Sequence, residues 1–180
     1  MDQELDQKKR LAQYPLTARQ RGFEWDFTKG CEDYEVWDEI EVGKSATAQN
    51  AFEVQVEDIL DFNRSCLETD PVFLDETNPR PHPLFVVMVT FYCIGTGIGS
   101  WIRTPGARNP GQTIEFLEDF VPGEVITATI THSDKWIRRG NYYMEDLVEL
   151  RNQGNALKAR WQVRLLLPPT RADVTRFAGL

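Results

Sequence analysis

The sequence predicts an α+β fold in which an antiparallel sheet wraps around a long central helix. The first observation behind this prediction is that residues 83–94 contain no charged side chain. A helix that is apolar all round is buried on every side, and this run is too short to span a bilayer. The second observation is that residues 112–167 form a series of strand-like segments separated by turns. Strands that follow helices along the chain, instead of alternating with them, are typical of α+β folds.

The turn before this central helix is expected to form a binding site. Residues 67–82 are rich in proline and acidic residues and include one of the two histidines. The N-terminus of a helix directs unpaired N–H groups and the positive end of its dipole outward. We therefore expect these backbone N–H groups to face a ligand, with the polar turn around it.

The chain divides into an N-terminal arm (1–33), a main domain (34–170) and a C-terminal tail (171–180). The start of the arm is charged, and an aromatic-rich stretch follows at residues 22–37. Such aromatic density is unusual in disordered tails, so the arm is expected to pack on the domain or on a partner. A loose tail with incidental aromatic residues is the alternative.

The first elements of the main domain are a strand, a second strand and a helix. Residues 39–43 resemble a strand edge that ends in a glycine turn, and residues 46–55 a first strand. From Val56 the apolar residues recur at helical spacing, which leaves Asp58 free to face water. The helix is expected to end near residue 68, because Pro71 disfavours a helical conformation at the residue before it.

Four strands are expected after the central helix and a proline- and glycine-rich loop at 105–111, namely 112–120, 124–133, 142–151 and 156–167. The last two are joined by a hairpin turn, in which Gly154 is expected to supply a positive φ. His132 reads as a residue near the end of its strand, and we expect it to take no part in catalysis.

Composition excludes several classes of function. The 180-residue chain has a formal net charge of -8, which argues against non-specific nucleic-acid binding. Its three cysteines are far apart and show no spacing typical of a metal site, so reduced thiols and a cytoplasmic location are expected. The N-terminus has no apolar run like that of a signal peptide. We expect no metal, no nucleic acid and no membrane association.

Several segments in order along residues 34–167 resemble the MaoC-like hydratases and dehydratases, which have the hotdog fold. The matching segments are 42–43, 56–62, 68–75, 120–124 and 152–155. The resemblance implies a lyase of fatty acid metabolism that hydrates an enoyl thioester or dehydrates a 3-hydroxyacyl thioester. It implies that coenzyme A or acyl carrier protein carries the substrate, without a further cofactor. It also implies paired subunits with the thioester bound between them.

The chain departs from this family at the catalytic loop. The active loop of the family reads Asp, any residue, Asn, Pro, an aliphatic residue and His, whereas this chain has Glu68, Asp70, Pro71 and Phe73 at the four defined positions. Phenylalanine cannot transfer a proton, so the usual pair is broken. The loop is similar to the degenerate one of double-hotdog proteins or of one subunit in a heteromeric hydratase.

Other residues of the same turn could supply the missing chemistry. Hydration needs a base for water and an acid for the α-carbon. Glu68 could be the base, and His82 could replace the imidazole. Each carboxylate could instead cap a turn, and His82 could be a turn residue with a satisfied ring. The candidate catalytic residues are His82, Glu68, Asp70 and Asp75, and the candidate substrate-binding residues are Arg80, Phe85 and Gly95.

Two of the substrate-binding candidates also have structural alternatives. Arg80 could meet a phosphate or carboxylate of the ligand or could be solvated. Gly95, with the other glycines up to residue 99, could permit close packing or end the helix.

Two classes of function follow from these observations. The first is a hydro-lyase, acting alone or sharing its site with a second hotdog subunit. The second is a non-catalytic hotdog subunit that binds the thioester or stabilises a catalytic partner. A thioesterase on the same fold is a weaker third possibility. In each case the open edges of the sheet predict at least a dimer, either a homodimer or a heterodimer with another hotdog subunit.

Overall fold

The computed structural model describes residues 34–48, 50–93 and 98–179. The predicted arm (1–33) and Gly95 lie outside these residues. The described strands form an antiparallel sheet in the order β1-β4-β5-β6-β3, and β2 also pairs with β4. The strands are β1 (Ser45–Thr47), β2 (Phe52–Glu53), β3 (Arg108–Phe116), β4 (Val125–Arg138), β5 (Asn141–Arg151) and β6 (Leu157–Leu166).

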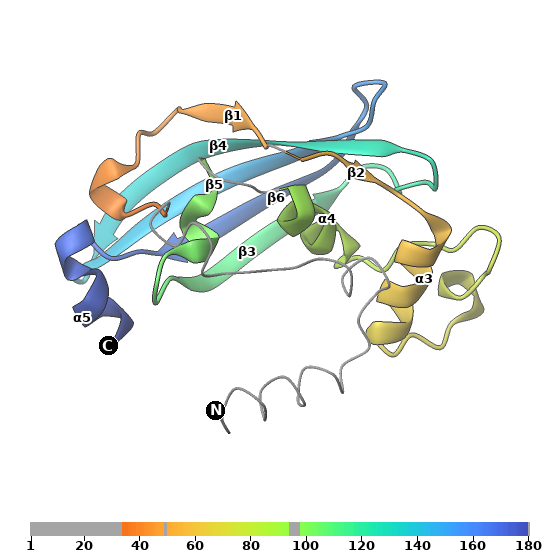
Figure 1. The fold of residues 1–180 in the computed structure, drawn as a ribbon, viewed down its shortest axis with the longest axis horizontal. Coiled ribbons are helices and arrows are strands. Elements are labelled where there is room, and N and C mark those ends of the chain that lie inside the picture. The colour runs from red at the N-terminus through yellow and green to blue at the C-terminus, as the bar shows by residue number, and fades with distance from the viewer. Residues whose placement is uncertain (1–33, 49, 94–97, 180) are drawn as a thin grey trace, which may run out of the picture.

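Three short α-helices accompany the sheet in the described residues, and Figure 1 shows the sheet curving over the central one. They are α3 (Val56–Ser65), α4 (Phe85–Cys93) and α5 (Val174–Ala178). The 3₁₀-helices are η1 (Trp37–Glu39), η2 (Pro71–Phe73), η3 (Ser100–Arg103) and η4 (Arg171–Asp173).

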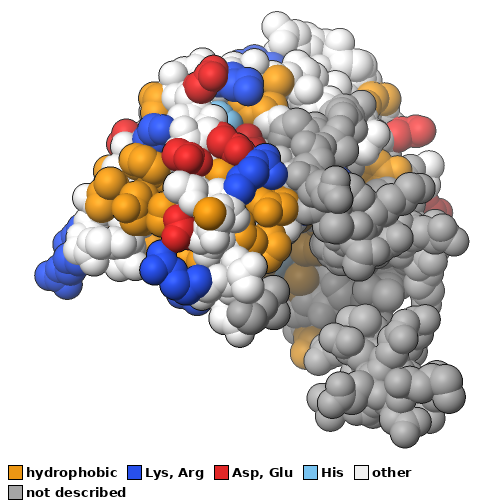
Figure 2. Space-filling view, turned by 60° about the vertical axis from the view of Figure 1, so that its left-hand side comes forward, with side chains coloured by type: hydrophobic (Ala, Val, Ile, Leu, Met, Phe, Trp, Pro, Cys, Tyr) orange, Lys and Arg blue, Asp and Glu red, His pale blue; other side chains and the backbone are white. Residues whose placement is uncertain are grey.

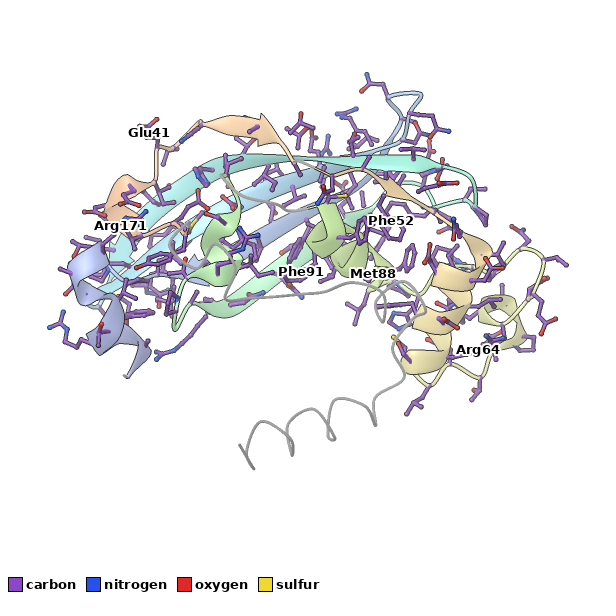
Figure 3. All side chains as sticks on the ribbon, in the orientation of Figure 1. Glu41, Phe52, Arg64, Met88, Phe91 and Arg171 are labelled. Carbon is purple, nitrogen blue, oxygen red and sulfur yellow. The ribbon has the colours of Figure 1, made fainter. Side chains whose placement is uncertain are left out.

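Helix α4 is shorter and less completely enclosed than predicted. It spans nine residues and begins two residues after Pro83. One side packs into the core, where Phe52 from β2 and Phe91 from α4 lie in the layer between sheet and helix (Figure 3). Several other residues of the helix, Phe91 among them, are only half-buried. The fully buried α4 residues are Phe85, Val86, Val89, Thr90 and Cys93, and the half-buried ones are Val87, Met88, Phe91 and Tyr92.

Helix α3 also differs from its prediction at both ends. At its start, the Asp58 carboxylate accepts a hydrogen bond from the Gln55 backbone N–H at 3.1 Å. Asp58 is therefore buried and does not face water. At its end the helix stops at Ser65, because Leu67 adopts a φ of 60°, which no right-handed helix allows.

Two strand predictions at the start of the domain were wrong in detail. Residues 37–39 form the 3₁₀-helix η1, so the expected strand edge at 39–43 is absent from the described chain. The predicted strand at 46–55 is two short strands, β1 and β2, which pair with different parts of β4.

The later strands are close to their predicted positions, with three corrections. Strand β3 spans Arg108–Phe116 instead of 112–120, because its pairing with β6 already begins at Arg108, inside the predicted loop. Strand β4 does not end near His132 but continues to Arg138. A bulge between His132 and Asp134 shifts the register there, so the strand continues past the polar residues 133–134. In the last hairpin the positive φ belongs to Asn155 (65°) and not to Gly154. Asparagine tolerates this left-handed conformation better than most side chains.

The surface carries mixed charge. On the face in Figure 2, acidic and basic side chains are interspersed with hydrophobic ones, and the coloured part shows no broad basic area. None of the helices in the described residues has the length and apolar character required to cross a bilayer.

Candidate active site

The connection between α3 and α4 brings two of the predicted catalytic residues together. Glu68 lies near its beginning and His82 near its end, and their Oε1 and Nε2 atoms are 3.4 Å apart. The His82 side chain is 18% exposed and that of Glu68 is 25% exposed. Both groups are thus within reach of a ligand while being partly withdrawn from water.

The His82 ring is oriented by its own backbone and by two aromatic neighbours. Its Nδ1 accepts a hydrogen bond from the Leu84 N–H at 3.0 Å. A neutral ring that accepts at Nδ1 carries its proton on Nε2, the nitrogen that faces Glu68. The rings of Phe62 and Phe73 lie 6.0 Å and 6.4 Å from the imidazole.

A pocket of about 250 Å³ opens beside His82, and Glu68 contacts the imidazole without being among the residues that line the pocket. One wall comes from the end of the α3–α4 connection and the other from the segment after β3. The lining is formed by Phe73, Arg80, Pro81, His82 and Pro83 on one side and by Phe116, Glu118, Asp119 and Phe120 on the other. The pocket thus combines apolar walls with one imidazole and a few charged groups at its rim.

An ion pair joins the two walls of the pocket. Arg80 Nε lies 3.4 Å from Asp119 Oδ2, and both side chains are 58% exposed. On the second wall, Glu118 pairs with the buried Lys158 ammonium at 3.3 Å. Among the described residues that line the pocket, Arg80 is the one with a cationic side chain. Solvent screening keeps its ion pair with Asp119 weak.

Asp70 and Asp75 are engaged in local turns and are not among the residues that line the pocket. Asp70 Oδ1 accepts a hydrogen bond from the Val72 N–H at 3.0 Å and caps η2. Asp75 Oδ1 accepts from the Thr77 hydroxyl, the Thr77 N–H and the Asn78 N–H. The Thr77 hydroxyl and these backbone bonds lower the pKa of Asp75. The geometry favours the capping alternative for both residues, and a catalytic role for either stays a prediction.

The backbone N–H groups at the entrance to α4 are largely occupied by protein atoms. The Leu84 N–H donates to the His82 ring, the Phe85 N–H donates to the His82 carbonyl at 2.8 Å, and the Val87 N–H donates to the Leu84 carbonyl. These three N–H groups are not available to a thioester oxygen in this arrangement. Phe85 itself is fully buried and stacks edge-on with Phe120 behind the pocket wall.

Asn63 is a site residue that the sequence analysis missed. Its side chain is fully buried on α3 and forms hydrogen bonds with three backbone groups of the connection. The Nδ2 group donates to the carbonyls of Phe73 (2.6 Å) and Arg80 (2.8 Å), and Oδ1 accepts from the His82 N–H (2.8 Å). The signal was present, because residue 63 follows Ile59 by four positions and is therefore a polar residue on the apolar face of this helix.

The second histidine lies in a sealed network on the sheet. His132 on β4 is 1% exposed, with Nδ1 2.6 Å from Asp146 Oδ1 and Nε2 3.0 Å from Glu35 Oε1. The Trp101 indole donates to the other Asp146 oxygen at 2.8 Å, and the Trp101 backbone N–H donates to Glu35. Burial opposes the charged ring, but the two carboxylates outweigh it and raise the pKa of His132 to about 9.

This arrangement leaves His132 with no nitrogen to offer a substrate, in agreement with the expectation that it is not catalytic. Within the described residues no group of histidine, cysteine and carboxylate side chains is arranged to hold a metal ion.

Solved structures of known hydratases and of a dehydratase complex share this fold. An R-hydratase from Pseudomonas aeruginosa aligns with a TM-score of 0.59 and 17% identity, over 75% of this chain and 86% of its own. An R-hydratase from A. caviae aligns with a TM-score of 0.56 and 18% identity, over 72% and 98%. The HadBC complex (3R-hydroxyacyl-ACP dehydratase) of Mycobacterium tuberculosis aligns with a TM-score of 0.58 and 15% identity, over 74% and 98%.

No protein-family model and no curated protein matches the sequence. The solved structures nevertheless show that the chain has the hotdog fold. More particularly, the fold is that of the MaoC-like hydratases and dehydratases, which confirms the α+β hotdog architecture expected from the sequence.

Proposed function

We propose that this protein is a hydro-lyase that interconverts an enoyl thioester and a 3-hydroxyacyl thioester, carried by coenzyme A or acyl carrier protein. The observation that carries the proposal is the contact of Glu68 and His82 beside the pocket, 3.4 Å between Oε1 and Nε2. Support for the reaction class comes from the R-hydratases and the dehydratase complex that share the fold.

The two side chains are suited to move protons in both directions. In hydration, the Glu68 carboxylate accepts a proton from water as the water oxygen bonds to the β-carbon. The π electrons shift to the α-carbon, which takes the proton from His82 Nε2. In the same step Glu68 passes the proton taken from water to Nε2, because a ring that accepts the Leu84 N–H at Nδ1 has no other proton and would otherwise become an imidazolate. Both groups thereby regain their starting state. Positioned acid–base groups of this kind typically accelerate a reaction by about 10²–10⁴-fold.

The displaced imidazole is central to this proposal. The family motif predicts a histidine at the position of Phe73, and this chain has its imidazole nine positions later, at residue 82. Folding of the connection returns that ring to within 6.4 Å of the Phe73 ring. An imidazole supplied from the far end of the same connection can therefore serve the same pocket wall.

The pocket also suits the proposed substrate class. Phe73, Phe116 and Phe120 give it apolar walls for an acyl chain. Arg80 at the rim could exchange its exposed Asp119 partner for a phosphate of the carrier, because an exposed ion pair of this kind is held by only about 0–1 kcal/mol.

We further propose that the active protein is a dimer, formed with a second copy or with another hotdog subunit. Strand β3 ends one side of the sheet path in the described chain. At its end, Phe116 and the adjacent Leu117 are 50% and 44% exposed. Both a free strand edge and exposed large apolar side chains favour association. The pocket lies beside this edge, so a partner could complete it.

Purified protein assayed with crotonyl-CoA and with a longer enoyl-CoA tests the proposal. Loss of the enoyl absorbance, with formation of the 3-hydroxyacyl product, is the expected result. Failure to hydrate either substrate, with or without a co-expressed hotdog partner, would overturn it. Release of free thiol without hydration would instead indicate a thioesterase.

Phe73 favours one alternative, a non-catalytic hotdog subunit. In that case hydration would appear only after a second subunit with an intact Asp and His loop is added. The activity of the mixture would then be insensitive to His82→Ala. Loss of activity in the same mixture on His82→Ala would exclude the alternative.

A further inference from the structure

The Glu68–His82 pair lies on a connection with little regular structure of its own. Glu68 is three residues after the end of α3, and His82 is three residues before α4. Asp70 and Asp75 organise only the turns directly beside them. The Arg80 N–H also donates to the Val72 carbonyl at 3.0 Å within the connection, but this bond does not join the backbone of Glu68 to that of His82. Contacts with the rest of the fold are therefore also needed to set the separation of the pair.

Asn63 makes these contacts from one buried position. Its side-chain amide binds the backbone at Phe73, Arg80 and His82. Its own backbone carbonyl accepts the Glu68 N–H at 3.2 Å. A single residue of α3 thus holds the backbone of both members of the pair.

Only a carboxamide can do this at that place. The carbonyl oxygens of Phe73 and Arg80 need two donors, and the His82 N–H needs an acceptor. The side chain that supplies all three must also be short enough to fit beneath the connection. Asparagine supplies both kinds of group, whereas aspartate has no donor when ionised and an aliphatic side chain has neither. Because the site is fully buried, water cannot replace a lost partner.

We propose that Asn63 is the positioning residue of the site, which sets the distance between Glu68 and His82 without touching the substrate. This inference rests on the proposed function for its kinetic consequence, but the geometric part can be measured without a substrate. It predicts that Asn63 is needed for turnover more than for substrate binding.

Asn63→Asp is the sharpest variant, because it keeps the shape and the acceptor for His82 but removes both donors. We expect kcat to fall about 10- to 100-fold, as for a small misplacement of catalytic groups, while KM changes by less than about threefold. The pH profile of kcat/KM should also shift. The matched control is Asn78→Asp, the same change at an exposed position of the same connection. Wild-type kinetics in the folded Asn63→Asp variant would overturn the inference.

A spectroscopic readout separates this inference from the proposed function. With only two histidines in the chain, ¹⁵N-histidine labelling gives two pairs of ring-nitrogen signals, which His82→Ala assigns. Asn63→Asp should shift or broaden the His82 signals and leave those of His132 unchanged. If wild-type protein has no hydratase activity but the signals respond, the positioning role stands and the proposed function fails. Unchanged His82 signals overturn the positioning role whatever the activity.

Native-state hydrogen exchange of the wild type covers the case in which Asn63→Asp does not fold. The His82 amide donates to the buried Asn63 Oδ1, so it should be protected from exchange more strongly than the exposed amides of the same connection. Exchange of the His82 amide at the rate of those exposed amides would overturn the inference.

Discussion

The two histidines of this protein occupy contrasting sites built from the same chemical groups. His82 has one carboxylate at 3.4 Å, a pocket beside it and a partly exposed ring. His132 has a carboxylate on each ring nitrogen, at 2.6 and 3.0 Å, and is almost completely buried. His82 precedes the central helix α4. His132 is linked to the segment after α4, because Glu35 and Asp146 also accept hydrogen bonds from Trp101 in that segment.

The difference shows how the surroundings of an imidazole determine its use. A ring whose nitrogens both have carboxylate partners in the core is held in one protonation state and fixes the elements around it. A ring with one nitrogen directed into an open pocket can exchange a proton with a ligand. The predictions below test this division, beginning with the largest expected effect.

Removal of the buried imidazole should affect stability most. His132→Ala leaves Asp146 and Glu35 close together without a cation between them. Breaking a buried pair in this way typically costs about 3–5 kcal/mol in the free energy of unfolding. Urea denaturation measures the change. For comparison, His82→Ala should cost less than about 1 kcal/mol, as is usual for substitutions of partly exposed side chains. Equal losses in the two variants would contradict the division.

Removal of the pocket imidazole should instead affect chemistry. In His82→Ala the proposed hydration should slow by at least about 100-fold in kcat, the lower limit of general acid–base catalysis. Steady-state kinetics with an enoyl-CoA measure it. Asn78→Asp, at an exposed position of the same connection, is the control and should retain most of the activity.

The pH dependence of stability should come from His132. The folded-state pKa of about 9 lies above the ordinary value of 6.5. The stabilisation is therefore fully present below about pH 6.5 and is lost as the pH rises through about 9. Thermal unfolding between pH 6 and 9 should show a decline in the wild type that is absent from His132→Leu. A decline of the same size in both proteins would assign the effect to other groups.

The smallest effects should come from the two capping carboxylates. Asp70→Ala removes the cap of η2, which typically costs about 0.5–2 kcal/mol of stability, and Asp75→Ala removes the hydrogen bonds of an exposed turn. Because both carboxylates are occupied by hydrogen bonds within their own turns, hydration should change by less than about threefold if Glu68 and His82 carry the chemistry. A loss comparable to that of His82→Ala would restore the aspartate concerned as a catalytic candidate.

Much of the fold could be predicted because its pattern is local. The alternation in β5 and β6 and the uncharged run of α4 can be recognised from consecutive residues of the sequence. The misplaced boundaries depended on distant partners. The extension of β4 to Arg138 required its pairing with β5, and the burial of Asp58 required its cap on Gln55.

The candidate site could be predicted only in part, for the same reason. Glu68 was predicted because the family resemblance places it at the position of the catalytic Asp, and His82 because it is the histidine of the same turn. Asn63 was missed although it lies on the apolar face of its helix, because its partners are backbone groups that a sequence does not display. The network of His132 joins residues 97 positions apart, Glu35 and His132, a separation no local pattern reveals.

The position of Glu35 has a practical consequence for defining the minimal folding unit. This residue precedes the first strand, yet its carboxylate is a counter-charge inside the core and its carbonyl accepts a hydrogen bond from the Thr104 hydroxyl at 2.7 Å. A truncation that starts at β1 would keep every strand but would remove the Glu35 carboxylate that neutralises the His132 imidazolium. The autonomous domain therefore extends upstream of its sheet.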